Sequence, residues 1–248
     1  MSFARYGATN GKPVLYLHGA GSSHIEGELY DEQARAAGIQ LIATDRPGCG
    51  GSSPAPGRTF TGYALDLQQL ADALGIGRFV VAGMSNGGVY AMAAAARLPE
   101  RITAAIPINS ATPLHDPAAL RATPFLWRMT YAQVRLLLPV TTWSLKKFAD
   151  SKTDNLVRRS AREVMRQPDS GYLTEEIRLV SADWGFDHAG VTQPVEIFTG
   201  DWDAGYRYAK VWAERLPAGR LHVFPGGHGG FAKPKAIERI VAAMVAAP

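Results

Sequence analysis

Short, uninterrupted apolar runs recur along the first half of this chain, and each run stops at a turn containing glycine or serine. The runs are PVLYL, QLIAT, FVVAGM and ITAAIPIN, at residues 13–17, 40–44, 79–84 and 102–109. A strand that is buried on both faces has this continuous pattern rather than an alternating one. Helical patterns at about 27–37, 61–74 and 87–97 separate the runs. Strands that alternate with helices predict an α/β protein with a mainly parallel sheet and helices on both of its faces.

The alternation stops at about residue 112 and resumes at about residue 191. Between these positions the pattern is helical, and prolines divide it into short segments. Two further strands at 194–199 and 220–224, and two helices at 205–216 and 235–246, complete the α/β pattern. The sequence therefore predicts one core, residues 1–111 and 191–248, interrupted after its fourth well-marked strand by a helical insert, residues 112–190.

Composition excludes several classes of protein. The chain has 248 residues, 46% of them hydrophobic, so it can bury a core, and no apolar run approaches the length of a membrane span. Its 26 basic and 22 acidic residues are scattered, so neither nucleic acid nor a membrane surface is expected as a partner. A single cysteine, Cys49, permits no internal disulfide and no multi-cysteine metal site. No apolar signal stretch is visible near residue 1, so a cytoplasmic protein is expected.

The most informative motif is GMSNG at residues 83–87, which directly follows a predicted strand and directly precedes a predicted helix. A serine on such a tight turn takes a strained backbone conformation, and the flanking glycines leave room for it. The turn presents the Ser85 hydroxyl at the carboxyl edge of the sheet, where the N-terminus of the helix favours negative charge. This context favours a nucleophilic serine over a glycine-rich turn with an incidental serine.

A serine hydroxyl is a poor nucleophile unless a base and an orienting acid accompany it. Among six histidines, His228 is in the best position for the base, because it lies between glycines in the loop after the last predicted strand. The candidates for the acid are Asp201 and Asp203, in the loop after the strand at 194–199. They are two residues apart, so the periodicity of an extended chain does not choose between them.

Taken together, these segments resemble the α/β-hydrolase superfamily, and in particular its capped serine hydrolases of the esterase type. The segments that carry the resemblance are LHGAG, DRPGCGGS, GMSNG, GDWD and GH, which begin at residues 17, 45, 83, 200 and 227. The resemblance implies the α/β-hydrolase fold and a triad in the chain order Ser85, Asp203, His228. The G-x-x-D spacing usual in that family favours Asp203, with Asp201 second and Asp116, from an earlier loop, third.

The resemblance also implies the rest of the site. The backbone N–H groups of Ala20 and Asn86 would form the oxyanion hole, and neither a cofactor nor a metal would be needed. The insert would act as a cap over the site. The pocket-lining residues would be His18, Phe125, Trp127, Tyr131 and Trp143. Each of these aromatic side chains has an alternative role, which is to pack the cap on the core. The family's first strands are expected to be reduced to one short edge strand around residues 2–6.

The expected reaction is hydrolysis of a small carboxylic ester, so the expected partner is a small acyl substrate; no oligomeric state is predicted. The same triad serves C–C bond hydrolases, lactonases, thioesterases, acyltransferases and aminopeptidases for N-terminal proline. The proline-releasing enzymes usually carry G-G-S-W-G and H-G-G-P-G, where this chain has GMSNG and HGAGS. A non-catalytic receptor for a small molecule is the third class considered, but such proteins usually have a degraded triad, and here all three positions are filled.

Two other motifs have weaker interpretations. The segment HGAG, followed by Asp45 about 24 residues later, resembles a dinucleotide-binding fingerprint, but His24 stands where its third glycine belongs. Cys49 lies in a glycine-rich loop with no strand-to-helix turn, so the sequence predicts that this thiol is inert.

Overall fold

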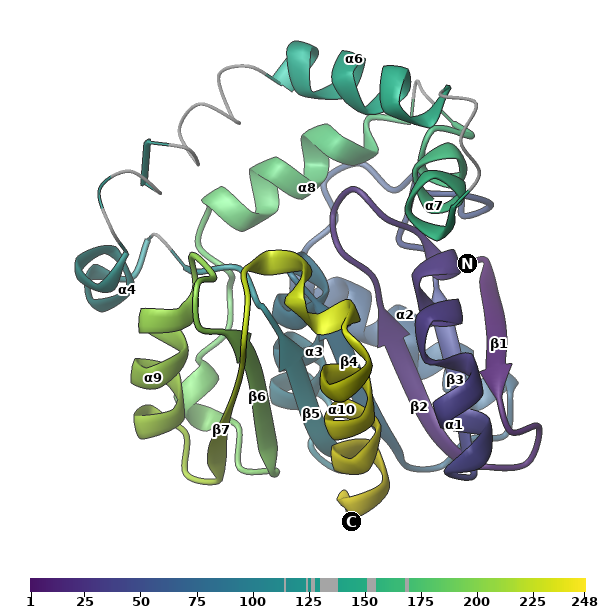
Figure 1. The fold of residues 1–248 in the computed structure, drawn as a ribbon, viewed down its shortest axis with the longest axis vertical. Coiled ribbons are helices and arrows are strands. Elements are labelled where there is room, and N and C mark those ends of the chain that lie inside the picture. Colours follow the sequence, from purple (N-terminus) through teal and green to yellow (C-terminus); the bar gives the residue numbers. More distant parts are fainter. Residues whose placement is uncertain (114, 124, 126–127, 130–137, 151–154, 168–169) are drawn as a thin grey trace.

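The computed structural model of the chain describes residues 1–248 apart from 114, 124, 126–127, 130–137, 151–154 and 168–169. Within this described part, seven strands form one sheet in the order β1-β3-β2-β4-β5-β6-β7 (Figure 1). The strands are β1 (Phe3–Gly7), β2 (Lys12–Leu17), β3 (Ile39–Thr44), β4 (Phe79–Met84), β5 (Ile102–Ile108), β6 (Val195–Gly200) and β7 (Gly219–Phe224). β1 is antiparallel to β3, and the other neighbouring pairs are parallel. The predicted fold class is confirmed, and each predicted strand lies within one residue of its observed bounds.

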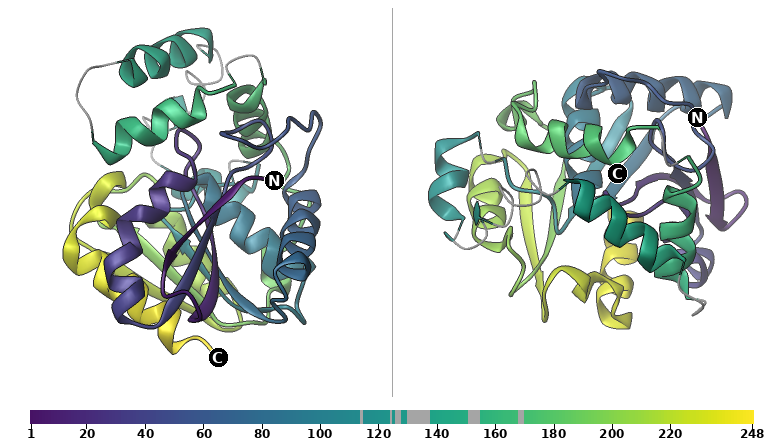
Figure 2. Two further views of the ribbon diagram at one scale, coloured as in Figure 1. Left: turned by 90° about the vertical axis from the view of Figure 1, so that its right-hand side faces the viewer. Right: turned by 90° about the horizontal axis from the view of Figure 1, so that it is seen from above.

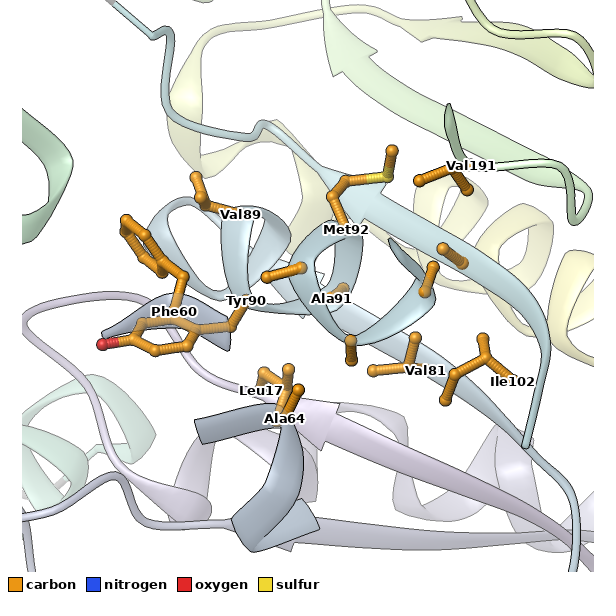
Figure 3. Packing of buried hydrophobic residues seen from close by; sticks show 14 of the residues in the cluster. Leu17, Phe60, Ala64, Val81, Val89, Tyr90, Ala91, Met92, Ile102 and Val191 are labelled. Carbon is orange, nitrogen blue, oxygen red and sulfur yellow. The ribbon is translucent and has the colours of Figure 1, made fainter. Parts of the chain in front are cut away.

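Helices cover both faces of the sheet (Figures 1 and 2). They are α1 (Asp31–Ala36), α2 (Phe60–Ala73), α3 (Asn86–Arg97), α9 (Tyr206–Arg215) and α10 (Pro234–Ala246). Because successive side chains of a strand point to opposite faces, Leu15 and Leu17 of β2 join the buried cluster of α2 and α3, whereas Val14 and Tyr16 join that of α1 and α10. Figure 3 shows part of the first cluster. No helix in the described part of the chain is long and apolar enough to cross a membrane.

The helix predicted at about 27–37 is wrong in its first half. The chain forms a 3₁₀ helix there, η1 (His24–Tyr30), and α1 begins only at Asp31. Gly27 in η1 packs so closely on Tyr6 and Ala43 that a Cβ at this position would lie 2.8 Å from each of them. Contact with the first and third strands therefore decides the conformation of this turn, and helical periodicity does not reveal it.

Between β5 and β6 the described residues form helices and no strand. These elements are α4 (Pro117–Ala122), α6 (Leu138–Ala149), α7 (Leu156–Val164), α8 (Tyr172–Ser181) and the 3₁₀ turn η2 (His188–Gly190). The helices α6, α7 and α8 lie beyond the carboxyl ends of the strands in two perpendicular views (Figures 1 and 2). This is where a cap would lie, while the division at residues 111 and 191 stays a prediction.

An aromatic cluster anchors the segment that follows α8 against the core helices. Trp184 is only 3% exposed, and its ring centroid lies 6.0 Å from that of Phe60 in α2 and 6.3 Å from that of Trp212 in α9. Phe186 stacks on the same indole at 6.1 Å. The chain therefore returns to β6 through a segment that is packed against two core helices.

We expect Trp184→Ala to lower the free energy of unfolding by about 3–5 kcal/mol, because it removes a buried indole and leaves a cavity. Trp202 provides the matched control, since its side chain is 82% exposed; Trp202→Ala should change the same quantity by no more than about 0.5 kcal/mol. Urea unfolding followed by circular dichroism measures both variants. Similar effects of the two substitutions would contradict the anchoring role of Trp184.

Candidate active site

The GMSNG motif forms the predicted turn between β4 and α3. Ser85 has φ 55° and ψ −120°, a conformation that residues other than glycine rarely adopt. Close packing explains both glycines: a Cβ on Gly83 would lie 2.1 Å from the carbonyl oxygen of Gly87, and a Cβ on Gly87 would lie 2.0 Å from that of Leu17. Only with glycine at both positions can α3 begin this close to β2 and β4.

Hydrogen bonds hold the strained Ser85 backbone from both sides. Its N–H donates to the carbonyl oxygen of Ile108 at 2.8 Å, and its carbonyl oxygen accepts from the N–H groups of Gly88 and Ala111 at 3.0 and 3.2 Å. The residue is partly exposed at the carboxyl edge of the sheet. The side chain is therefore presented at a fixed place where a ligand can reach it.

His228 and Asp203 form a hydrogen-bonded pair. His228 begins the 3₁₀ helix η3 (His228–Ala232) after β7, and its Nδ1 lies 2.6 Å from Oδ2 of Asp203. Since an ionised carboxylate only accepts hydrogen bonds, we assign the imidazole proton to Nδ1, which leaves Nε2 as an acceptor. The Asp203 side chain is 2% exposed and that of His228 is 54% exposed. One edge of the imidazole is thus fixed in the protein, and the ring remains accessible.

Asn109, the residue after β5, joins the loops that carry this pair. Its Nδ2 donates to the carbonyl oxygen of His228 at 2.7 Å, and its Oδ1 accepts from the N–H of Gly200 at 2.8 Å. Sequence reasoning did not identify Asn109 as part of the site. The available signal was its place at the end of a central strand, where a side chain can bridge the loops that follow neighbouring strands.

The other two candidate acids have different partners. Asp201 is exposed, and its Oδ1 accepts from a backbone N–H in the loop before η3 at 2.8 Å. Asp116 lies 2.8 Å from a guanidinium nitrogen of Arg215 in α9. Of the three candidates, Asp203 is the one whose carboxylate contacts His228.

Among the hydrogen bonds of the described residues, the backbone N–H groups of Ala20, in the loop after β2, and of Asn86 and Gly87, at the start of α3, have no acceptor. Asn86 is the first residue of α3, where N–H groups have no partner within the helix. The loop that carries Ala20 approaches the turn closely, since a Cβ on Gly19 would lie 3.7 Å from Cβ of Ser85. Both donors named from the sequence therefore lie on segments that adjoin Ser85.

A buried ion pair beside this turn was not foreseen. Arg46 follows β3, Glu176 lies in α8 of the insert, and their side chains are 0% and 1% exposed with a nitrogen–oxygen distance of 3.1 Å. Arg58 binds the same carboxylate at 2.9 Å. Burial raises the pKa of Glu176, but the two arginine charges outweigh it and lower the pKa to about 2. A glutamate within a short amphipathic helix normally faces solvent, so the sequence carried no signal for Glu176.

The predicted pocket residues have different outcomes. His18 is fully buried, and burial together with the charge of Arg46 lowers its pKa to about 3, so the ring is neutral at pH 7. Phe125 and Trp143 are 70% and 58% exposed, so their predicted place in a pocket gains no support from the structure. Trp127 and Tyr131 lie outside the described residues.

Two groups of described side chains could hold a metal ion, and both include Asp45. The groups are His18, Asp45 and Cys49, and His24, Asp45 and Glu163, with their ligand atoms within 4.8 Å of one another. Protein donors already bind Asp45, since Oδ2 lies 2.7 Å from both Ser2 Oγ and His24 Nδ1, which also leaves this carboxylate poorly placed for a ribose. Burial raises the pKa of Cys49 well above its usual value, which opposes a thiolate. That the protein needs no metal stays a prediction.

A mainly parallel α/β sheet that carries a strained serine between a central strand and the helix that follows it has the architecture of an α/β hydrolase. The family model described as "alpha/beta hydrolase fold" matches residues 12–189. The chain belongs to this family.

Part of the chain is similar in sequence to proline iminopeptidases. Over 91 residues the chain is 36% identical to a proline iminopeptidase of Lactobacillus delbrueckii subsp. lactis, and over 102 residues it is 31% identical to one of Neisseria gonorrhoeae. These matches span 34% and 39% of this chain but only 31% and 32% of the relatives.

Solved structures match over nearly the whole chain. An esterase from Exiguobacterium antarcticum has a TM-score of 0.78 and 22% identity, with 98% of this chain and 94% of that chain covered. A bromoperoxidase from Bacillus anthracis has a TM-score of 0.76 and 20% identity, with the same coverage. At these identities the likeness concerns the fold alone.

Proposed function

We propose that this protein is a serine hydrolase that cleaves small carboxylic esters through an acyl-enzyme intermediate. The observation that carries the proposal is the 2.6 Å hydrogen bond between Nδ1 of His228 and Oδ2 of Asp203. It joins a buried acid to an accessible imidazole at the sheet edge where Ser85 is presented. Ser85, His228 and Asp203 are then the nucleophile, the base and the orienting acid.

The proposed reaction has two halves. Ser85 Oγ attacks the ester carbonyl while Nε2 of His228 accepts the hydroxyl proton, and the imidazolium then gives that proton to the leaving alkoxide. In the second half, water loses a proton to Nε2 and attacks the acyl carbon; the bond between the acyl carbon and Ser85 Oγ then breaks as the imidazolium returns the proton to Oγ, which releases the carboxylic acid and regenerates the enzyme. Asp203 holds the required tautomer throughout and stabilises the positive charge that forms on the imidazole.

The oxyanion of each tetrahedral intermediate would be bound by the N–H groups of Ala20 and Asn86. Backbone donors suit this role, because they are oriented before the reaction and need not reorganise as charge develops. One such donor is typically worth about 3 kcal/mol of transition-state stabilisation. The lack of any acceptor for these two groups in the described part of the chain supports the assignment.

We also propose that the insert, residues 112–190, acts as a cap that shields the site and shapes the substrate pocket. The support is the position of α6, α7 and α8 beyond the carboxyl ends of the strands (Figure 1). A cap of this kind excludes water from the site and selects substrates by size.

A second candidate is release of N-terminal proline, which the similarity to proline iminopeptidases favours. That similarity spans about a third of the relatives' length, and both loop motifs differ from those usual in proline-releasing enzymes. A proline p-nitroanilide, assayed beside esters, distinguishes the two functions. Cleavage of the anilide with a higher kcat/KM than any ester would favour the peptidase.

We expect Ser85-dependent hydrolysis of p-nitrophenyl esters. Acetate, butyrate, hexanoate and octanoate esters form the test series, and Ser85→Ala is the control. This substitution should lower kcat by at least about 10³-fold, since only the oxyanion hole and substrate binding remain. Its unfolding midpoint should equal or exceed that of the wild type, because Ser85 is partly exposed. A variant that retains more than a few per cent of the activity would refute the mechanism.

Asp203→Asn should lower kcat by roughly 10³–10⁴-fold, because an amide can hold the wrong imidazole tautomer and cannot stabilise imidazolium. Asp201→Asn is the matched control on the same loop, and we expect less than a tenfold loss. Both constants are measured on the best ester of the series. The reverse pattern would assign the acid to Asp201. If neither substitution lowers kcat, Asp116→Asn is the next variant to test.

A further inference from the structure

The Ala20 N–H, one of the two proposed oxyanion donors, belongs to the peptide unit between Gly19 and Ala20. A planar trans peptide points its C=O and its N–H in opposite directions. Whatever holds the carbonyl oxygen of Gly19 therefore also fixes the direction of the Ala20 N–H.

Three donors converge on the Gly19 carbonyl oxygen. They are Nδ1 of His18 at 2.7 Å, Nη2 of Arg46 at 3.1 Å and the N–H of Ser22 at 3.2 Å. Nη1 of Arg46 also donates to the carbonyl oxygen of His18. The guanidinium thus binds two successive carbonyl groups of the loop and places a full positive charge at one end of the peptide that carries the Ala20 N–H.

Arg46 is itself held by the insert. It is fully buried, Nε donates to Oε1 of Glu176 at 3.1 Å, and Nη2 donates to the hydroxyl of Tyr172 at 2.8 Å. Both partners lie in α8. The guanidinium also lies 4.9 Å from the ring centroid of Tyr90 in α3. These contacts hold the guanidinium with Nη1 and Nη2 directed at the carbonyl oxygens of His18 and Gly19.

The second proposed donor meets the same carboxylate. Nδ2 of Asn86 donates to Oε2 of Glu176 at 3.2 Å. The peptide before Asn86 is held at its carbonyl end too, because the Ser85 oxygen accepts from Gly88 and Ala111. Glu176 is therefore linked to both peptide units whose N–H groups would bind the oxyanion, to one through Arg46 and to the other through the Asn86 side chain.

We propose that Arg46, held by Glu176 of α8, is a positioning residue of the oxyanion hole, in which its guanidinium orients and polarises the Gly19–Ala20 peptide. The inference rests on the proposed ester hydrolysis. A cation bound to the carbonyl end draws electron density from the amide and makes its N–H a stronger donor. A stronger N–H donor gains most when its acceptor oxygen becomes negatively charged. Arg46 should therefore stabilise the transition state and have little effect on the bound ester.

Arg46→Met tests this role, and Arg58→Met is the matched control. Arg58 binds the same Glu176 carboxylate at 2.9 Å and its side chain is 6% exposed, but the other hydrogen bonds that its guanidinium makes in the described part of the chain go to Tyr90 and Tyr172. Both substitutions break a buried ion pair, so both should lower the unfolding midpoint. We expect only Arg46→Met to lower kcat, by about 10- to 100-fold, less than the loss of a whole oxyanion donor. KM should stay within about threefold, as expected for an interaction made in the transition state.

A trifluoromethyl ketone gives a second readout, since the adduct of its carbonyl with a serine carries an oxyanion. Its inhibition constant should rise in Arg46→Met in proportion to the fall in kcat/KM and stay near the wild-type value in Arg58→Met. Equal losses of kcat in the two variants, or wild-type kcat in Arg46→Met, would overturn the positioning role.

Two further arms keep the test decisive. If Arg46→Met does not fold, Arg46→Lys and Arg58→Lys replace the two methionine variants. A lysine keeps the positive charge, but its single ammonium group cannot bind Glu176 and the carbonyl oxygens of His18 and Gly19 in the way that the planar guanidinium does. Arg46→Lys should then lower kcat at least about threefold more than Arg58→Lys, and equal values would overturn the role. If the wild type shows no Ser85-dependent ester hydrolysis, the proposed function itself fails. If the wild type is active and Arg46→Met has the same kcat, only the positioning role of Arg46 fails.

Discussion

The close approach of α3 to the sheet is the constraint on which the site depends. Gly87 lies where any Cβ would meet the Leu17 carbonyl oxygen at 2.0 Å, so α3 begins directly above β2 and β4. The chain can make this turn only by placing Ser85 at a positive φ, a conformation that costs about 1–3 kcal/mol and persists because surrounding contacts enforce it. That approach accounts for three features of the site: the partly exposed Ser85, the Asn86 N–H that has no acceptor among the described residues, and the nearness of the loop at Gly19.

Buried charge then connects α8 to this turn. Removing one partner of a buried ion pair leaves an uncompensated charge in a medium of low polarity, which is strongly destabilising. Arg46 and Arg58 both form ion pairs with Glu176. Movement of α8 away from the core would therefore leave two buried guanidinium groups without their carboxylate partner. We therefore regard α8 as a fixed wall of the proposed site. Aromatic packing of Trp184 against Phe60 and Trp212 holds the chain that follows α8.

The sequence revealed those features that local pattern determines. Continuous apolar runs placed the strands, because a strand covered on both faces has no polar side, and glycines around Ser85 revealed the turn. Periodicity could not separate Asp201 from Asp203, since the choice depends on a turn after β6 in which the Asp203 N–H donates to the Gly200 carbonyl; the family spacing favoured the residue that contacts His228. Glu176 and Asn109 were missed because their roles arise from partners far away in the chain.

The central claim is that Ser85 is an activated nucleophile, and covalent labelling tests it most directly. The intact wild-type protein is treated with a fluorophosphonate, its mass is measured, and the modified peptide is sequenced by tandem mass spectrometry. The account predicts one adduct per chain, located on Ser85. It also predicts no labelling of Ser85→Ala under the same conditions. An unlabelled wild type, or an adduct on a different residue, would contradict the account.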